Sequence, residues 1–311
     1  MEKMATRDAY GRALVKLGAE NKDIVVLDAD LAGSTRTKEF KKHYPERFFN
    51  MGIAEQNMMG TAAGLATAGK IVFASTFAIF ATGRAFEQIR NSIAYAKLNV
   101  KIVASHAGLT VGEDGASHQA IVDISIMRSL PNMTVIVPAD GVEAEKAVIA
   151  AAQYNGAVYI RMGRSAVPVI YQQDYDFAIG KASVLKEGQD VSVLACGIMI
   201  AESLKAAEEL AQEGISVKVI NVATIKPIDK EAIVKAAQET GAIVTVEEHS
   251  IIGGLGSAVA EVLVENEPVP MERVGVKDIF GESGKPQALL EKYGLTAKEV
   301  VSAVKKVLAR K

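Results

Sequence analysis

Short apolar runs alternate with longer, Ala-rich segments along the first half of the chain. The runs are almost continuously apolar, which is typical of strands buried on both faces of a parallel sheet. The segments between them are long enough for helices. The pattern predicts strands at 23–30, 70–77, 100–106, 133–140 and 157–163. It predicts helices at 7–20, 54–68, 81–97 and 140–154, the last opened by a capping box of Asp140 and Glu143.

The alternation lapses after residue 164 and resumes near residue 190. Residues 165–189 are polar and aperiodic, so we expect a linker with one short hairpin there, and a domain boundary near residue 180. Further strands are predicted at 190–197, 215–224, 241–249 and 271–276. Further helices are predicted at 199–213, 229–240, 254–265 and 296–311, with Thr296 and Glu299 as a capping box for the last.

This order of elements predicts the fold class α/β, with two doubly wound domains and mainly parallel sheets. We expect the first domain at 1–170, the linker at 171–189 and the second domain at 190–311. A chain of 311 residues that is 49% hydrophobic is long enough to bury two cores.

Charge and cysteine content exclude some classes of function. The 35 Lys and Arg residues nearly balance the 37 Asp and Glu residues, which favours neither nucleic acid nor an anionic membrane as a partner. The single cysteine, Cys196, excludes an internal disulfide and lies in an apolar run, so we expect it to be buried. The N-terminus lacks a signal-type apolar segment, and no apolar run is long enough to span a membrane, so we expect a cytoplasmic protein.

Polar and glycine-rich residues follow several predicted strands. In open parallel sheets, ligands bind outside the carboxyl ends of the strands. Ordinary turn chemistry is the simpler explanation for Asp30 and Ser34 taken alone. The clustering favours a shared cleft, which these residues would face: Asp30, Ser34, Phe77, Phe80, His106, Asp114, His118 and Arg164.

The segment SHAGLTVGEDGASHQ, residues 105–119, contains two of the four histidines, His106 and His118, on either side of Asp114. Its spacing fits neither a structural zinc site nor an EF-hand. Histidines bonded to the backbone are one alternative. Two imidazoles at a strand end favour a polar ligand whose hydroxyl groups they bind, with proton exchange near neutral pH. Asp114 would accept hydrogen bonds from such hydroxyls.

Glu55 is the only charged residue in FFNMGIAEQNMMGTAAG, residues 48–64. A carboxylate in such apolar surroundings is expected to retain a proton more readily unless it has a charged partner. Compensation of the helix dipole at a first turn explains this residue equally well.

Four segments together resemble the pyrimidine-binding and C-terminal domains of transketolase, and the resemblance covers essentially the whole chain. They are GIAEQNMMGTAAGLA, STFAIFATGRAFEQIR, SHAGLTVGEDGASHQAIVDISIMRSLPNMTVIVPADG and VEEHSIIGGLGSAV. The resemblance implies a thiamine diphosphate enzyme that transfers a two-carbon ketol unit between sugar phosphates, as in the pentose phosphate pathway.

The sequence departs from a full transketolase in one respect. The family's GDG motif, followed about thirty residues later by Asn, belongs to an N-terminal domain that holds Mg²⁺ and diphosphate. Here only EDG at 113–115 and ADG at 139–141 occur. The resemblance therefore implies the C-terminal half of a split transketolase, working with a GDG-containing N-terminal subunit. It implies a self-dimer within an α2β2 assembly, and no metal ligand in this chain.

The resemblance also implies roles for residues around the cofactor. Glu55 matches the catalytic glutamate that shares a proton with N1′ of the aminopyrimidine. Phe77 and Phe80 match the aromatic wall against that ring, and Gly83 stands where the family has a third aromatic residue. Asp30 matches a residue of the cofactor cleft.

A second group of matches concerns the sugar. His106 and His118 match catalytic imidazoles that contact hydroxyl and carbonyl oxygens of the sugar, and Asp114 matches the aspartate that reads hydroxyl configuration. Arg7, Ser34 and Arg164 match anchors of the sugar phosphate, for which the planar guanidinium is well suited. Arg161 competes with Arg164 for that role. His249 is expected at a domain interface or in a loop.

Three other readings remain open from the sequence. The β subunit of a 2-oxo acid dehydrogenase has the same two domains but would not be expected to carry VGEDGxxHQ. A deoxyxylulose-phosphate synthase has Ala where Glu113 stands and lacks His106. A non-catalytic assembly subunit is the third reading, and it would need neither Glu55 nor the loop histidines.

Overall fold

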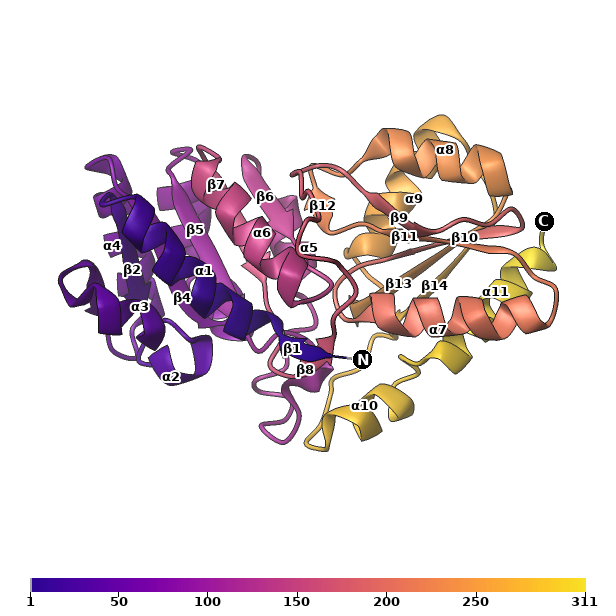
Figure 1. The fold of residues 1–311 in the computed structure, drawn as a ribbon, viewed down its shortest axis with the longest axis horizontal. Helices are drawn as coiled ribbons and strands as arrows, with labels where there is room; N and C mark the ends of the chain where they lie inside the picture. Colours follow the sequence, from indigo (N-terminus) through magenta and orange to yellow (C-terminus); the bar gives the residue numbers. More distant parts are fainter. Residues whose placement is uncertain (1) are drawn as a thin grey trace.

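The structure, a computed structural model, describes residues 2–311 as two α/β lobes lying side by side (Figure 1). The first lobe is built on a seven-stranded sheet in the order β12-β6-β7-β5-β4-β2-β3. All neighbouring strands are parallel except β12, which is antiparallel to β6. The strands are β2 (Ile24–Asp28), β3 (Phe48–Asn50), β4 (Ile71–Phe77), β5 (Val100–Ser105), β6 (Met133–Ile136), β7 (Ala157–Arg161) and β12 (Thr224–Lys226).

Helices cover both faces of this sheet. One face is covered by α1 (Thr6–Glu20) and α6 (Gly141–Gln153), which pack on each other, with α3 (Lys38–His43) beside them. The other face is covered by α4 (Glu55–Thr67), η2 (Phe80–Arg84), η3 (Gln88–Ala94) and α5 (Asp123–Ser129). Shorter elements of this lobe are α2 (Ala32–Thr35), η1 (Pro45–Arg47), η4 (Leu109–Val111) and the antiparallel pair β1 (Lys3–Ala5) and β8 (Ala166–Pro168).

The second lobe repeats the layered arrangement on a five-stranded sheet in the order β14-β13-β10-β11-β9. Its strands are β9 (Ser183–Lys186), β10 (Val191–Ala195), β11 (Val217–Asn221), β13 (Ile243–Ser250) and β14 (Met271–Val276), and only β9 is antiparallel to its neighbour. Its helices are α7 (Met199–Gln212), α8 (Lys230–Thr240), α9 (Leu255–Asn266), α10 (Pro286–Lys292) and α11 (Ala297–Leu308). The predicted fold class is thus confirmed.

One apolar core continues from the first lobe into the second. It contains Met59 of α4 and Ile124 of α5 together with Ile233 of α8 and Leu255 of α9. The chain reinforces this junction when β12, which follows β11 of the second lobe, returns to pair with β6 of the first. Burial of apolar area shared between the lobes fixes one lobe against the other. Cys196 is buried in this core, as predicted.

The predicted helix at 81–97 is not a regular α-helix. The structure forms two π-helical segments there, η2 and η3, separated by three residues. The Thr82 hydroxyl donates to the Ala78 carbonyl oxygen at 2.8 Å. A side chain thus competes with the backbone amides for this acceptor in the preceding turn. Gly83, next to it, adds no packing that would favour a tighter helix. Such π-bulges often occur at functional sites.

Two expectations about local structure are wrong. The linker contains no hairpin, because its strand β9 pairs with β11 of the second sheet instead of with a neighbour in sequence. Thr296 does not cap α11 with its side chain, since its hydroxyl donates to the Glu299 carboxylate. The cap at Asp140 is confirmed: its carboxylate accepts from the Glu143 amide at 2.8 Å.

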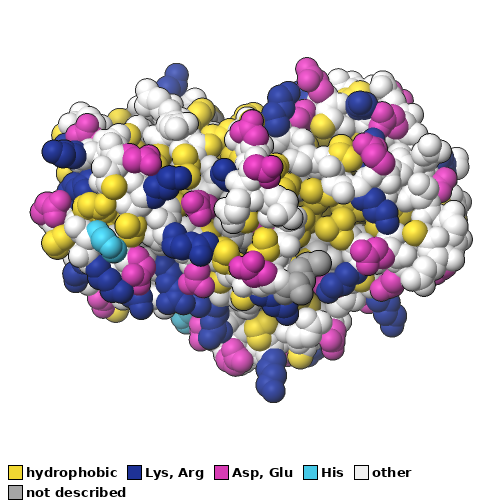
Figure 2. All heavy atoms as spheres, viewed as in Figure 1, with side chains coloured by type: hydrophobic (Ala, Val, Ile, Leu, Met, Phe, Trp, Pro, Cys, Tyr) yellow, Lys and Arg dark blue, Asp and Glu magenta, His cyan; other side chains and the backbone are white. Residues whose placement is uncertain are grey.

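Charged side chains of both signs are interspersed over the face shown in Figure 2, and hydrophobic side chains gather there where the two lobes meet. This mixture agrees with the formal net charge of −2. Within residues 2–311, no helix combines the length and the apolar character that crossing a membrane requires.

Candidate active site

The carboxyl ends of four adjacent strands, β7, β5, β4 and β2, meet at one edge of the first sheet. Phe77 ends β4, His106 follows β5, and the segment with Asp30 and Ser34 follows β2. The register pairs Phe77 with Ser105, which places the next residue, His106, beside that phenyl ring. Sequence and sheet topology together therefore create a polar cleft at this edge.

Two imidazoles and two phenyl rings form one aromatic cluster in the cleft. The rings of Phe77 and His106 are stacked with centroids 3.8 Å apart, and those of Phe77 and Phe80 with centroids 5.7 Å apart. The ring of His118 meets Phe80 edge-on at 5.2 Å. We call the loop over residues 105–119 the sugar loop, after the role that the sequence resemblance implies for it. This loop brings both of its histidines to the aromatic wall. His106 has a positive φ of 58°, an uncommon backbone conformation for this residue type.

His106 is held in its neutral form. Its side chain is buried, and burial together with the positive charge of Arg7 lowers its pKa to about 3. The Nδ1 atom lies 2.9 Å from the Ser105 hydroxyl and the Nε2 atom 3.5 Å from an Arg7 nitrogen. Because guanidinium only donates, this network assigns the proton to Nδ1 and leaves Nε2 as an acceptor. The lowered pKa argues against a protonated His106 near neutral pH, whereas proton exchange by this residue stays a prediction.

Arg7, Ser34 and Arg164 lie around the same end of the cleft. Arg7 donates to the Ser34 carbonyl oxygen at 3.0 Å, while its buried Nε has no hydrogen-bond partner within residues 2–311. Burial and the nearby Arg36 charge lower the pKa of Arg7. Arg164 donates to the Val111 carbonyl oxygen and forms an ion pair of 3.2 Å with Glu113. Converging guanidinium groups with an unused donor suit a bound anion.

The two arginines that competed for the phosphate role have different surroundings. Arg161 is buried and pairs with Asp123 at 2.8 Å, and it donates to the carbonyl oxygens of Ala120 and Glu248. The Arg161 guanidinium is thus already neutralised by a buried carboxylate and hydrogen-bonded within the protein. Arg164 is partly exposed at the cleft, with 35% of its side chain accessible. The accessible residue is Arg164.

Glu55 begins α4 and is 4% exposed. Its carboxylate pairs with Arg84 at 3.1 Å, and the Arg84 guanidinium also lies over the Phe80 ring at 4.0 Å from the centroid. Sequence reasoning missed Arg84, which is half-exposed and 29 positions from Glu55. The π-helical turn η2, which ends at Arg84, is what carries this side chain back to the first turn of α4.

Two predicted residues stand apart from this cluster. Asp30 is exposed with a φ of 64° and accepts from the Asn50 amide at 2.7 Å, without contacting the aromatic wall. Asp114 is exposed at the tip of the sugar loop, and its carboxylate makes no hydrogen bond to another residue within 2–311. An unpaired carboxylate at this position remains free to accept hydrogen bonds from a ligand.

Asp28 is a residue that sequence reasoning did not single out. It is buried and accepts hydrogen bonds from the Leu31 amide at 2.6 Å and the Thr35 and Thr37 hydroxyls at 2.7 and 2.8 Å. Burial raises its pKa, and these bonds oppose the rise. Asp28 shapes the turn that presents Asp30 and Ser34. The DxD spacing after a buried strand was the available signal.

The residues present fit the aminopyrimidine end of thiamine diphosphate. A buried carboxylate, Glu55, faces a cavity of ≈430 Å³ lined by Ile53–Asn57 and Arg84. The stacked phenyl rings supply an apolar wall. A Cβ built on Gly83 meets no atom within 4 Å, so the missing third aromatic leaves open space. No group of three or more His, Cys, Asp or Glu residues suited to a metal ion occurs within residues 2–311.

His249 is fully buried between the lobes. Its Nδ1 lies 2.7 Å from the Ser250 carbonyl oxygen, and its Nε2 accepts from the Ser125 amide at 3.4 Å. Ser125 belongs to the first lobe and His249 to the second. The residue therefore occupies the interface position expected of it and does not line the cleft described above.

Comparison with known proteins places this architecture in one family. Models of the transketolase pyrimidine-binding domain and the transketolase C-terminal domain match residues 2–169 and 180–300. A putative transketolase C-terminal section from Methanocaldococcus jannaschii is 53% identical over 301 residues, covering 96% of this chain and 94% of that protein. A 6-deoxy-6-sulfo-D-fructose transketolase subunit from a Clostridium species is 48% identical, covering 100% of this chain and 97% of that subunit.

A solved structure described as a split gene transketolase, inactive beta4 tetramer, has a TM-score of 0.93 and 62% sequence identity. The similarity covers 98% of this chain and 99% of that chain. Sequence and structure thus agree over nearly the whole length of these three proteins, one of which is named as a C-terminal section. The chain belongs to the transketolase family and corresponds to the C-terminal section of a split transketolase, with pyrimidine-binding and C-terminal domains.

Proposed function

We propose that this chain is the catalytic C-terminal subunit of a thiamine diphosphate-dependent transketolase. It transfers a two-carbon ketol unit from a ketose phosphate to an aldose phosphate, together with a separate N-terminal subunit. The observation that carries the proposal is the chain of contacts from buried Glu55 through Arg84 and Phe80 to the stacked rings of Phe77 and His106, and on to Arg7. Two relatives, one at 53% identity named as a transketolase C-terminal section and one at 48% named as a transketolase subunit, favour it over a dehydrogenase β subunit or a deoxyxylulose-phosphate synthase.

The residues around Glu55 support cofactor activation. When bound, thiamine diphosphate supplies the electron sink for breaking and forming the carbon–carbon bond. Glu55 holds or releases a proton at N1′ of the aminopyrimidine, and its burial at 4% exposure keeps water from competing for that proton. Phe77 and Phe80 provide the apolar wall for the ring. Arg84 pairs with Glu55 and lies over the Phe80 ring in this structure, so it would have to release the carboxylate before Glu55 could contact a bound aminopyrimidine.

The other end of the cleft supports sugar binding. Neutral His106 would accept a hydrogen bond from a sugar hydroxyl at Nε2 in place of the long 3.5 Å contact from Arg7, and His118 and Asp114 offer further polar atoms from the same loop. Arg7 and Arg164 hold the terminal anion, for which Arg7 has an unused Nε donor. The name of the Clostridium relative contains a sulfonate, which presents three oxygens around a tetrahedral centre as a phosphate group does. Guanidinium groups at this end of the site would therefore bind either anion.

The partner requirement is supported by the relatives. The similar solved structure is described as a split gene transketolase, inactive beta4 tetramer, and the Clostridium relative is named as a subunit. We infer an N-terminal subunit that carries the GDG motif and holds Mg²⁺ and the diphosphate. Each cofactor would then lie between one copy of each subunit, in an α2β2 assembly.

Co-expression with that N-terminal subunit tests the proposal. The complex is expected to convert xylulose 5-phosphate and ribose 5-phosphate in the presence of thiamine diphosphate and Mg²⁺, whereas neither subunit alone does. A parallel assay with 6-deoxy-6-sulfo-fructose as donor distinguishes a phosphate-selective from a sulfonate-accepting site. If the assembled, cofactor-loaded complex transfers a two-carbon unit from neither donor, ketol transfer as the function is refuted.

A further inference from the structure

The sugar loop belongs to the first lobe, but its conformation is fixed by contacts from the second. The Thr110 amide near its start donates to a carboxylate oxygen of Glu248 at 2.7 Å. Toward its end, the Gln119 side-chain amide donates to the Glu282 carbonyl oxygen at 2.9 Å, and between them the Ser283 hydroxyl donates to the Glu113 carbonyl oxygen at 2.6 Å. Figure 1 shows α10, which follows this second-lobe segment, at the junction of the lobes.

Glu248 makes the most buried of these contacts. It lies near the end of β13, is 4% exposed and points across the lobe boundary at the loop backbone. A Cβ built on Gly108 would lie only 2.2 Å from its carboxyl carbon, and Gly108 has a φ of 79°. Both facts require glycine there. The loop backbone is therefore shaped to receive this carboxylate.

Glu248 is part of a buried charged network that includes both lobes. Burial raises its pKa, and the Arg161 guanidinium, 4.0 Å away, opposes that rise. Arg161 also donates to the carbonyl oxygens of Ala120 and Glu248 at 3.0 and 2.9 Å. Ala120 directly follows the sugar loop, so the same network holds the loop near both ends.

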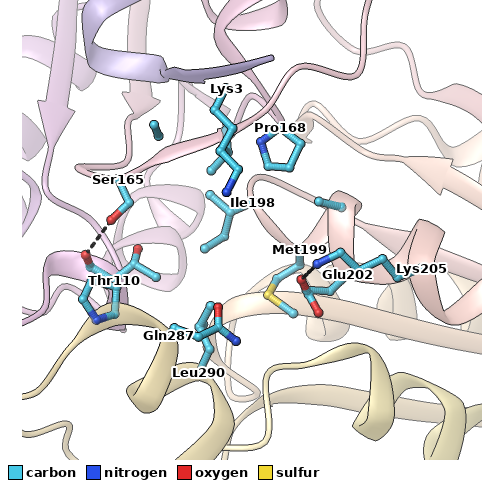
Figure 3. Close-up of a pocket in the computed structure, with 14 residues that line it drawn as sticks. Lys3, Thr110, Ser165, Pro168, Ile198, Met199, Glu202, Lys205, Gln287 and Leu290 are labelled. Carbon is cyan, nitrogen blue, oxygen red and sulfur yellow. Dashed lines mark hydrogen bonds and ion pairs between the residues drawn. The ribbon is translucent and has the colours of Figure 1, made fainter. Parts of the chain in front are cut away.

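On its other side, the loop borders open space. Figure 3 shows Thr110 and Ser165 together at one wall of a cavity of ≈250 Å³, with Lys3, Ile198 and Met199 on the facing side. The only hydrogen bond drawn across this wall joins the Ser165 hydroxyl to the Thr110 carbonyl oxygen, and at 3.4 Å it is long. The 2.7 Å bond to Glu248 is thus the shorter of these two polar contacts of the Thr110 backbone, and it acts beside the packing of η4 against α10.

We propose that Glu248 is a positioning residue through which the second lobe sets the sugar loop. Its carboxylate fixes the Thr110 amide, and thereby the spacing of His106 and His118 along the aromatic wall. The second lobe thus controls sugar binding through this loop. The assignment of the loop to sugar recognition rests on the proposed function, but the mechanical role of Glu248 does not.

Amide hydrogen exchange of the full chain tests the mechanical role without any assay of activity. In Glu248→Ala the peptide over residues 105–119 is expected to exchange about tenfold faster, because the Thr110 amide loses a charged acceptor. Glu248→Gln keeps an acceptor oxygen and should restore most of the protection. Glu248→Asp withdraws the carboxylate by one methylene and should also accelerate exchange. This variant keeps the test decisive if Glu248→Ala does not fold. Unchanged exchange in the Ala or Asp variants would overturn the proposal.

Glu247 provides a matched control on the same strand. It is 1% exposed and accepts from the amides of Leu255 and Gly256 at 2.7 and 2.8 Å, so it caps α9 and contacts no part of the sugar loop. Glu247→Ala is expected to lower the melting temperature with the exchange of residues 105–119 unchanged. If it accelerates that exchange as much as Glu248→Ala does, general destabilisation and not positioning explains the effect.

Kinetics of the assembled enzyme then tests the consequence for function. Glu248→Ala should raise the KM for both sugars about tenfold and change kcat less than about threefold, with rescue by Gln. A fall in kcat with unchanged KM would contradict control of sugar binding. If wild-type enzyme shows no ketol transfer, the proposed function fails while the exchange data still decide whether Glu248 positions the loop.

Discussion

At the scale of single residues, the cleft depends on a few side chains whose neighbours are distant in sequence. The stacking of Phe77 and His106 follows from parallel strands ending side by side, and their strand ends were recognisable from the sequence. The pairing of Glu55 with Arg84 was not, because a half-exposed arginine inside an expected helix gives no periodic signal. The sequence therefore indicated which aromatic side chains and imidazoles lie in the cleft, but it did not indicate which charged side chains pair there.

The neutral state of His106 gives a pH prediction. Its folded pKa lies near 3, below the usual value of 6.5, so the unfolded chain binds the proton more readily than the folded one between these values. This contribution to stability is fully present above pH 6.5 and is lost as the pH falls toward 3. In His106→Gln, the slope of the unfolding free energy against pH should be smaller in that window, by the amount that corresponds to the uptake of about one proton on unfolding. An NMR titration in which the His106 ring signals shift between pH 5 and 8 would contradict the neutral assignment.

Asp114→Ala should reduce discrimination between donors more than it reduces cofactor activation. A site that bonds a hydroxyl rejects an analogue lacking it, since its own polar groups are then unpaired. Asp114 is exposed and free to make that bond. The ratio of kcat/KM for hydroxylated against deoxygenated or epimeric donors should therefore fall in the variant. An equal loss for every donor would show that Asp114 is structural and not selective.

At the scale of elements, long buried runs were predictable and short or irregular elements were not. The strands β2, β4 and β5 and the helices α1, α4 and α6 follow directly from apolar runs and Ala-rich segments. The three residues of β12 pair with a sheet of the other lobe, which no local pattern encodes. The helix α5 is separated from the end of the sugar loop by three residues and, with seven residues, is too short to show a clear period.

The cap of α6 gives a stability prediction at this scale. The buried Asp140 carboxylate accepts from the amide of Glu143 at 2.8 Å and, with its other oxygen, from those of Ile170 and Tyr171 at 2.6 and 2.9 Å. It therefore joins the helix start to the segment between the lobes. Asp140→Ala should lower the free energy of unfolding by about 2–4 kcal/mol, the sum of a lost cap and unsatisfied buried amides.

Thr296→Ala is the matched control, because Thr296 precedes α11 without a side-chain cap to the backbone. Its loss should change the unfolding free energy by less than about 0.5 kcal/mol. Urea denaturation of both variants measures the difference. Equal losses in the two variants would show that the Asp140 bonds contribute nothing beyond an ordinary surface change.

At the scale of the whole molecule, the two lobes behave as one folding unit with an incomplete cofactor site. The continuous core through Ile124 and Leu255 fixes the lobes against each other. Large apolar side chains remain exposed on the first lobe near Glu55, with Ile53 at 78% and Phe49 at 45%. Exposed apolar surface of this kind favours association, and the similar chain described as a tetramer shows such self-association.

The isolated chain is therefore expected to be folded and self-associated but to bind thiamine diphosphate weakly. Stacking and one carboxylate contact must offset an association cost of several kcal/mol. In the proposed assembly, Mg²⁺ and the diphosphate are held by the partner. Calorimetric titration of the chain alone should show weak binding that Mg²⁺ does not strengthen, and addition of the partner should make it tight. Tight, Mg²⁺-dependent binding without a partner would place the diphosphate site in this chain.

The central claim is that this chain carries the carboxylate that activates the cofactor, and one substitution tests it most directly. Glu55→Gln preserves size and keeps an acceptor oxygen for Arg84 but cannot share a proton with the aminopyrimidine. Steady-state ketol transfer is measured for wild-type and variant enzyme, each assembled with the N-terminal subunit and saturated with cofactor. The variant is predicted to turn over about a hundredfold or more slowly, with an unchanged melting temperature. Turnover within a few-fold of wild type would contradict the role assigned to Glu55.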